Sequence, residues 1–308
     1  MKLGTFEHRG RAVPVLHTGL GIVDLQAASG HGTARAGGWQ PPPGFQLLDL
    51  IGAGEPGLAF AHQVLADEQA CRAATLDPTA GRWLAPLPQT PRNVFCVGRN
   101  YADHVHEDNT SRDLATPLPE HPQFFTKPPT AIVGPDADVR LDERVTRRLD
   151  YEVELAVVVG RGGRDIDADD ALAHVFGYTI VNDVTARDLQ RRHDQWFKGK
   201  ALDTSCPMGP WIVTADEIPD PHALQIRLWV NDELRQDAST AQMIFRIPQT
   251  MAALSAGLTL LPGDVLATGT PSGVGYAMNP RRFLADGDVM SCEVQGIGQL
   301  RNTVRAVR

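Results

Sequence analysis

Short hydrophobic runs alternate with glycine- and proline-containing turns along most of this chain, which is the pattern of a protein built from many short β-strands. Beyond about residue 92, six runs are the clearest predicted strands: Asn93–Gly98, Tyr151–Gly160, Phe176–Val181, Gln225–Asn231, Asp264–Thr268 and Val289–Val294. Fewer stretches predict helices, namely Ala168–His174, Ala186–Arg192 and Pro248–Ala256. The fold class predicted from this balance is β-rich α+β.

The first 90 residues have a pattern of their own. Strand-like runs lie around Val13–Leu16 and Gly21–Leu25, and a helical stretch follows near Ala59–Ala74. The proline-rich segment Pro86–Pro91 has the composition of a linker. We therefore expect a small N-terminal domain over residues 1–90 and a main domain over residues 91–308.

Composition excludes several classes of partner. The 308 residues include 42% hydrophobic residues, enough for a sizeable core, and carry a net charge of −8, which argues against nucleic-acid binding. No apolar run approaches the roughly 20 residues of a membrane helix, and the first eight residues carry charges where a signal peptide needs an apolar stretch. We expect a cytoplasmic protein with neither a nucleic-acid nor a membrane partner.

Cysteine and lysine usage adds two smaller points. The four cysteines are scattered without a CxxC pair, so they predict neither a zinc site nor a disulfide framework, and Cys96 and Cys292 fall in predicted strands as buried apolar residues. Only four of the 29 basic residues are lysine. Three of these, Lys127, Lys198 and Lys200, lie in the segments with candidate chemistry, where arginine does not replace a compact ammonium group.

Paired carboxylates mark the segment 150–160, which reads DYEVELAVVVG. Side chains alternate along a strand, so Glu152 and Glu154 share one face, and near a core two carboxylates need a compensating cation. Asp183 follows the next predicted strand and would supply a third carboxylate if the two strand ends are adjacent. Such an all-oxygen site suits Mg²⁺, Mn²⁺ or Ca²⁺. From the spacing alone, a solvated strand face explains the two glutamates equally well.

A histidine and a glutamate stand three residues apart in the segment 98–107, GRNYADHVHE. If Asp103 caps a short helix, His104 and Glu107 share a face, and the carboxylate can orient the imidazole as a general base. His106 is the rival histidine on the opposite face, and an isolated HxxE is more often an exposed loop pair.

The turn 268–275, TGTPSGVG, follows a predicted strand and offers backbone N–H groups suited to an anion such as a carboxylate. It lacks the lysine of a phosphate-binding loop, and by itself it is more typical of an ordinary tight turn.

Six segments in this order resemble the fumarylacetoacetate hydrolase family, within the bacterial group of acylpyruvate hydrolases and 2-hydroxyhepta-2,4-diene-1,7-dioate isomerases. They are 98–107 (GRNYADHVHE), 124–128 (FFTKP), 150–154 (DYEVE), 182–190 (NDVTARDLQ), 200–204 (KALDT) and 268–275 (TGTPSGVG). Each segment is only moderately specific, and their order is the specific part. The resemblance covers about residues 90–308, and many members carry a smaller N-terminal domain.

The resemblance implies a mixed β-roll of the fumarylacetoacetate hydrolase type, usually a homodimer, that acts on a small oxo-acid. It implies Mg²⁺ or Mn²⁺, with Ca²⁺ as a further candidate. By resemblance, the site residues are the metal ligands Glu152, Glu154 and Asp183; the catalytic residues His104, Glu107 and Lys200; and the substrate-binding residues Arg99, Lys127, Gln190 and Thr270. Lys198, a near neighbour of Lys200, ranks below it.

One departure concerns the lid that the resemblance places over the site. The stretch between Glu107 and Phe124 is longer than in compact members, and its Asn109–Leu118 part is polar and contains proline. We expect this difference to affect the choice of substrate more than the chemistry.

Hydrolysis of a carbon–carbon bond in an acylpyruvate-like β-diketo acid is the reaction favoured at this point, because His104 and Glu107 would activate water and Lys200 would assist the oxyanion. The same site could decarboxylate oxaloacetate, or tautomerise, isomerise or hydrate a 2-oxo-alkenoate. A non-catalytic metal-binding or oxo-acid-binding protein is the reading from another class, and no missing site residue suggests it.

Overall fold

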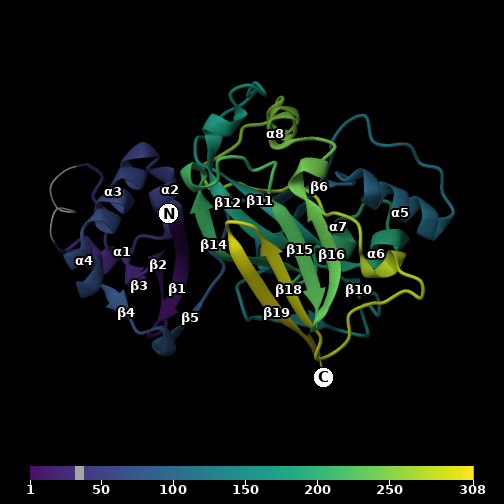
Figure 1. The fold of residues 1–308 in the computed structure, drawn as a ribbon, viewed down its shortest axis with the longest axis horizontal. Coiled ribbons are helices and arrows are strands. Elements are labelled where there is room, and N and C mark those ends of the chain that lie inside the picture. Colours follow the sequence, from purple (N-terminus) through teal and green to yellow (C-terminus); the bar gives the residue numbers. More distant parts are fainter. Residues whose placement is uncertain (32–37, 308) are drawn as a thin grey trace.

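The computed structural model describes residues 1–31 and 38–307, and its strands form mixed sheets flanked by short helices (Figure 1). The strands are β1 (Lys2–His8), β2 (Arg11–Thr18), β3 (Gly21–Asp24), β4 (Thr75–Leu76), β5 (Gly81–Trp83), β6 (Val94–Gly98), β7 (Gln123–Lys127), β8 (Ile132–Val133), β9 (Asp138–Leu141), β10 (Leu149–Asp150), β11 (Val153–Val159), β12 (Val175–Asn182), β13 (Thr185–Ala186), β14 (Cys206–Thr214), β15 (Gln225–Val230), β16 (Glu233–Ser239), β17 (Val265–Ala267), β18 (Val289–Val294) and β19 (Gly298–Ala306). The helices are α1 (Leu25–Ala28), α2 (Leu47–Gly52), α3 (Glu55–Ala66), α4 (Glu68–Ala73), α5 (Ala102–Arg112), α6 (Arg187–Arg192), α7 (Phe197–Lys200) and α8 (Ile247–Ser255).

The large sheet runs in the order β4-β3-β2-β1-β14-β12-β11-β17-β6-β7, and a second sheet runs β16-β15-β18-β19-β9. Both parallel and antiparallel pairs occur, since β17 is parallel to β6 whereas β11 is antiparallel to β12. The prediction of a β-rich α+β fold is confirmed.

Both faces of β11 are buried, which explains its unbroken apolar sequence. Leu155 and Val157 belong to the core shared with β15 and β18 of the second sheet. Ala156 and Val158 point to the opposite face, into the core shared with α2 and α3. A strand buried on both sides has no polar face, so its sequence does not alternate. Glu152 and Glu154 lie at the one end of this strand where carboxylates interrupt the apolar run.

The N-terminal residues join the large sheet directly, because β1 pairs antiparallel with β14, matching Lys2 with Val213 and Leu3 with Ile212. One hydrophobic core also contains residues from both sides of residue 90, among them Leu50 and Val181. The large sheet therefore continues across the expected boundary at residue 90. A separate domain over residues 1–90 stays a prediction.

Several predicted elements change in detail. The helix expected over Ala59–Ala74 is two helices, α3 and α4, divided at Asp67, whose carboxylate accepts a hydrogen bond from the Ala70 amide at 2.9 Å. Ala168–His174 contains only a 3₁₀ turn, over Ala171–His174. The long strand β14 was not among the clearest predicted strands, because prolines and glycines interrupt its sequence.

The cysteines and the helices also bear on the expectations from composition. All four cysteines are buried free thiols, in agreement with the absence of a disulfide pattern. Across residues 1–31 and 38–307, no helix combines the length and apolar character needed to cross a membrane.

Candidate active site

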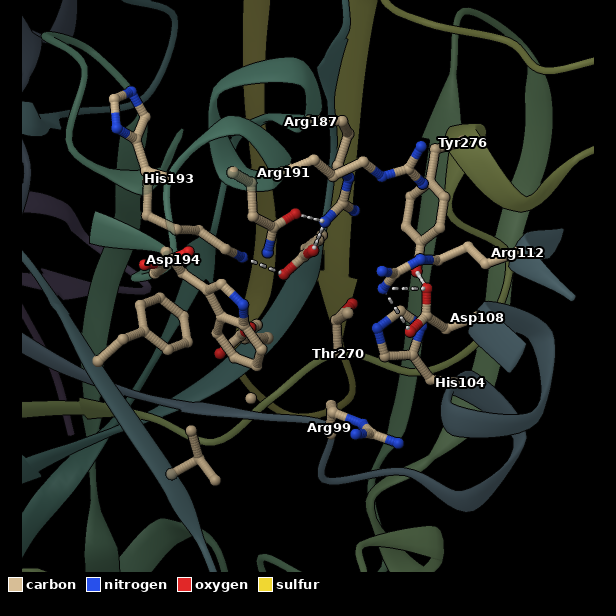
Figure 2. A pocket seen from close by; sticks show the side chains of 18 residues that line it. Arg99, His104, Asp108, Arg112, Arg187, Arg191, His193, Asp194, Thr270 and Tyr276 are labelled. Atoms are coloured by element: carbon tan, nitrogen blue, oxygen red, sulfur yellow. Dashed lines mark hydrogen bonds and ion pairs between the residues drawn. The ribbon is translucent and has the colours of Figure 1, made fainter. Parts of the chain in front are cut away.

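A cavity of about 350 Å³ opens where the ends of the central strands meet α5, α6, α7 and the loop after β17 (Figure 2). Its lining is rich in charged groups, which are Arg99, His104, Asp108, Arg112, Glu152, Glu154, Arg187, Arg191, His193, Asp194 and Lys200. Seven further residues complete the wall: Val97, Gly98, Phe125, Gln190, Trp196, Thr270 and Tyr276.

Three buried carboxylates lie together at the inner end of the cavity. Oxygen atoms of Glu152, Glu154 and Asp183 are all within 4.8 Å of one another, and each residue is at most 4% exposed. Pairing of β11 with β12 matches Val153 with Asn182, so the residues just outside each strand are neighbours, and the Asp183 amide donates to the Glu152 carbonyl at 2.8 Å. Glu152 precedes the strand rather than lying in it, yet the expected convergence occurs. The alternative of a solvated strand face does not fit this burial.

Buried cations partly neutralise these carboxylates. Nζ of Lys200 lies 2.8 Å from Glu152 Oε2 and 2.6 Å from Asp183 Oδ2. Arg187 contacts Glu152 Oε1 at 2.6 Å and Asp150 Oδ2 at 2.9 Å. Burial raises the pKa of Glu152, but Lys200 and Arg187 outweigh it and lower that pKa to about 2. Burial lowers the pKa of Lys200, but Asp183 and Glu152 outweigh it and raise that pKa.

Glu154 is the carboxylate of this group with no cationic partner among the described residues. Its Oε2 atom accepts one hydrogen bond, from the Gly269 amide at 2.8 Å. Burial and then the neighbouring Asp183 and Glu152 charges hold the pKa of Glu154 well above its usual range. A buried carboxylate that faces two others is costly unless a cation offsets the charge. The oxygen donor set and this uncompensated charge therefore fit a hard divalent cation, which makes a divalent metal plausible at the site.

The position of Lys127 does not match the expected substrate contact. Its side chain is fully buried, and its ammonium donates to Asp183 Oδ1 at 2.6 Å, to the Val184 carbonyl at 3.1 Å and to the Lys200 carbonyl. These contacts use all three donors of a lysine. Lys127 therefore lies behind the carboxylate group and orients Asp183, and it does not line the cavity.

Lys200 and Lys198, both on α7, have different positions relative to the cavity. Lys200 lines the cavity and is buried, at the end of the short helix α7. Lys198 lies two residues earlier on the same helix and is exposed. The structure therefore brings Lys200 into the site and leaves Lys198 outside it.

His104 and Glu107 meet on the inner face of α5. His104 Nδ1 lies 2.8 Å from Glu107 Oε1, and the histidine lines the cavity. Because an ionised carboxylate only accepts hydrogen bonds, Nδ1 carries the proton and Nε2 is left as the basic nitrogen. The helix begins at Ala102 after Tyr101, so Asp103 lies in its first turn and is not the cap. His106 is exposed on the other face.

The loop 268–276 binds anions, but they are the protein's own carboxylates. Amide groups of this loop donate to Glu154 from Gly269, to Glu107 from Gly273 at 2.9 Å, and to Asp150 from the residues at 275 and 276. Gly269 has φ of +95°, and a Cβ there would lie 2.8 Å from the Cβ of Asn100, so only glycine fits. Through these hydrogen bonds, the loop connects the buried carboxylate group to α5, the helix that carries His104.

The remaining expected substrate residues line the cavity. Gln190 accepts a hydrogen bond from Arg187 at 3.2 Å, and its amide NH₂ group has no acceptor among the residues that the structure describes. Thr270 donates to the Val153 carbonyl at 2.9 Å and accepts from Gln236. Arg99 lies at the opening in the left-handed region, with φ of +57°.

Several cavity residues were given no role from the sequence. Arg187 lies within a segment that carried the family resemblance, so its position was visible but its ion pairs were not. Asp108 and Tyr276 are joined by a 2.9 Å hydrogen bond across 168 positions of sequence. Arg112 and Arg191 lie at the cavity mouth on different helices. Of these five residues, only Arg187 could have been assigned to the site from its surrounding sequence. The other four come together through tertiary packing.

The chain is similar to known proteins in both sequence and structure. The family model described as fumarylacetoacetate (FAA) hydrolase C-terminal matches residues 93–305. The oxaloacetate tautomerase YisK of Bacillus subtilis (strain 168) is 50% identical over 220 residues, covering 71% of this chain and 72% of that protein. A mitochondrial oxaloacetate tautomerase of Homo sapiens is 40% identical over 282 residues, covering 91% and 86%.

Among solved structures, maleylpyruvate hydrolase from Sphingobium sp. SYK-6, in complex with manganese(II) and pyruvate, superposes with a TM-score of 0.77. The two chains are 30% identical, and the match covers 100% of each. The fold therefore has a counterpart in a solved structure that holds a divalent metal.

Proposed function

This chain belongs to the fumarylacetoacetate hydrolase family, and on that premise we propose that it is a divalent-metal-dependent enzyme that interconverts the keto and enol forms of oxaloacetate. The observation that carries the proposal is one cavity in which a buried carboxylate group adjoins a histidine–glutamate pair within a cationic wall. The sequence relatives named as oxaloacetate tautomerases support this reaction over the C–C hydrolysis that the sequence analysis favoured.

Glu152, Glu154 and Asp183 would hold the metal, and we propose Mg²⁺ or Mn²⁺, since the donors are all oxygen. When bound, the metal would supply Lewis acidity toward the 2-oxo group of the substrate. The buried ammonium of Lys200 would add positive charge beside the same oxygen. Lys127 would act from behind by orienting Asp183.

Tautomerisation needs one proton to move at the carbon next to the carbonyl and one at the oxygen. We assign the carbon proton to His104, because Glu107 holds its Nδ1 and leaves Nε2 as the basic nitrogen. The free amide group of Gln190 and the guanidinium of Arg99 would orient the substrate from the cavity wall. In the enol-to-keto direction the His104 imidazolium would give a proton to C3 while the enol hydroxyl releases its proton to solvent, and His104 would then regain a proton from solvent. The reverse reaction would remove the C3 proton and return a proton to the oxygen.

The test starts from enol oxaloacetate, with the loss of its ultraviolet absorbance recorded alongside carbon dioxide release. EDTA-treated protein reloaded with Mg²⁺ or Mn²⁺ is compared with the same metal alone, because free metal also promotes the reaction. Faster loss of the enol without carbon dioxide, abolished by EDTA and by His104→Ala, is expected. A rate equal to that of metal alone would overturn the proposal.

Hydrolysis of an acylpyruvate is the second candidate, because the same pair of His104 and Glu107 can activate water, and because the similar Sphingobium protein is named a maleylpyruvate hydrolase. Release of pyruvate from an acylpyruvate, together with no effect on enol oxaloacetate, would favour it.

We also propose that the protein is a cytoplasmic homodimer. Support for the dimer comes from exposed aromatic residues at the edge strand β7 and beside it. Phe124 is 38% exposed and Phe197 is 45% exposed, and both line one surface depression together with Trp196. Edge strands with exposed apolar side chains are usually covered by a partner. A monomeric mass by light scattering at micromolar concentration would contradict the dimer.

A further inference from the structure

Three arginines gather around Tyr276 on one side of the cavity (Figure 2). Arg187 and Arg191 come from α6, and Arg112 is the last residue of α5. The guanidinium carbons of Arg187 and Arg191 lie 4.4 Å and 5.1 Å from the centre of the Tyr276 ring. In the figure, His193 and Asp194 lie on the opposite side of the cavity.

These arginines differ in how well their charge is neutralised. Arg187 is buried and paired with two carboxylates, Asp150 and Glu152. Among the described residues, Arg112 has only a loose contact with Asp108, at 3.3 Å, and Asp108 already accepts the hydroxyl of Tyr276 at 2.9 Å.

Arg191 has neither a carboxylate nor a carbonyl partner within the part of the chain that the structure describes. Although Arg191 is exposed, partial desolvation and then the nearby guanidinium groups of Arg112 and Arg281 lower the pKa of Arg191, because like charges face one another across the mouth. A cluster of this kind is unfavourable by itself and is relieved by an anion.

The position of the cluster limits what that anion can be. The inner end of the same 350 Å³ cavity holds the carboxylate group proposed to bind metal, and Arg112 and Arg191 line its outer part. A small molecule held at the inner end by a carboxylate and an adjacent oxygen would direct its other end toward these arginines. A guanidinium is planar and presents paired donors, which match a carboxylate.

We propose that Arg191 and Arg112 form a subsite for the distal carboxylate of the substrate, so that the enzyme selects four-carbon dicarboxylic oxo-acids over monocarboxylic ones. This inference rests on the proposed function, and it adds which residues set the choice of substrate. It also gives a role to the stretch Asn109–Leu118, whose first residues extend α5 and carry Arg112 to the cavity mouth.

The chain contains a matched control for Arg191. Arg192 is the next residue on α6 and carries the same charge. It lines a neighbouring surface depression, which Arg191 also borders, but unlike Arg191 it does not line the cavity. Arg192→Gln therefore removes one positive charge near the mouth without touching the proposed subsite. Arg191→Gln removes the charge and keeps a polar side chain.

The first experiment measures binding without turnover. Calorimetry on the Mn²⁺-loaded protein compares malate with 2-hydroxybutyrate, which shares the carboxylate and hydroxyl end but lacks the distal carboxylate. Wild type should bind malate more tightly. Arg191→Gln should lower the affinity for malate by roughly tenfold or more, as expected for the loss of a charge-assisted hydrogen bond. The affinity for 2-hydroxybutyrate should stay unchanged. Arg112→Gln should act in the same direction, and Arg192→Gln should change neither ligand.

The second experiment uses the reaction, with oxaloacetate and its 4-methyl ester as substrates. Arg191→Gln should raise KM for oxaloacetate by about tenfold with little change for the ester. Equal losses for both substrates, or a wild type that binds malate no better than 2-hydroxybutyrate, would overturn the subsite. Preferential malate binding in a protein without tautomerase activity would instead overturn the proposed function and leave the subsite standing.

Discussion

Nδ1 of His104 lies 2.8 Å from Oε1 of Glu107, and the other oxygen of that carboxylate accepts the amide of Gly273 at 2.9 Å. One side chain therefore orients the imidazole and attaches α5 to the loop after β17. The position of α5 beside the cavity and the alignment of the base are coupled, because the same carboxylate makes both contacts.

Replacing either member of this pair should reduce turnover to different extents. His104→Ala removes the proton-transfer group, and we expect kcat to fall by ~10²–10⁴-fold. Glu107→Gln keeps the size of the side chain but weakens the hold on the imidazole, so a smaller loss is expected. Stopped-flow measurement of enol loss would check both values. Full activity in His104→Ala would contradict the assigned role.

Tyr276→Phe should weaken the attachment of α5 to the loop after β17. The Tyr276 hydroxyl donates to Asp108 Oδ1 at 2.9 Å, which is a second attachment of α5. Losing one such bond costs about 1 kcal/mol, so amide exchange across Ala102–Arg112 should speed up roughly fivefold. Hydrogen-exchange mass spectrometry measures this. Tyr178→Phe is the matched control, since that phenol lies on β12 in the large sheet; equal acceleration in both variants would argue against the attachment.

Glu154→Gln should have opposite effects on the metal-free and metal-loaded proteins. Without metal it removes an uncompensated buried charge, so thermal stability should stay equal or rise. With metal, wild type should gain about 2.7 kcal/mol at a concentration of 100 times Kd, whereas the variant should gain little. Calorimetric unfolding with and without Mn²⁺ tests the pair of effects. A variant that keeps the full gain would remove Glu154 from the ligand set.

Lys127→Met should destabilise the metal-free protein by about 3–5 kcal/mol, because it leaves the fully buried Asp183 without one of its two cations. Lys198→Met is the matched control and should change the free energy of unfolding by less than about 0.5 kcal/mol, since Lys198 is exposed. Urea unfolding of both variants checks the difference. Two equal, small effects would mean that the Lys127 pairing contributes nothing net.

His222 should contribute an acid-sensitive part of stability. Its Nε2 atom accepts the Ile247 amide at the start of α8 at 3.1 Å, which requires the neutral ring. Burial and then Arg246 lower the pKa of His222 below its usual value of about 6.5, although Asp220 opposes them. The folded state therefore binds fewer protons than the unfolded state just below pH 6.5, and stability should fall as the pH drops from there toward the lowered pKa.

The variant His222→Gln keeps an acceptor near the helix start but does not titrate. Between pH 7 and pH 5, the free energy of unfolding should fall in both proteins, and the fall in the variant should be smaller than that in wild type by about 1 kcal/mol. Parallel curves for the two proteins would show that His222 does not contribute to the pH dependence.

Local pattern was sufficient for the central strands and for the types of site residue. The apolar run after Glu154 predicts β11 because a strand buried on both faces has no polar alternation. The spacing of Glu152 and Glu154 places two carboxylates at one strand end, and the i,i+3 spacing of His104 and Glu107 places that pair on one helix face. These relationships need only the geometry of one element.

Tertiary structure decided the relationships between elements. The family resemblance implies that both Lys127 and Lys200 face the substrate, yet Lys127 is enclosed behind Asp183 with every donor used, and only Lys200 lines the cavity. Arg191 meets Arg112 only because α6 and α5 pack on either side of Tyr276, 85 residues beyond Arg191 in the chain. Long-range contacts of this kind depend on how the strands cross and pair, and a single sequence carries no local signal for them.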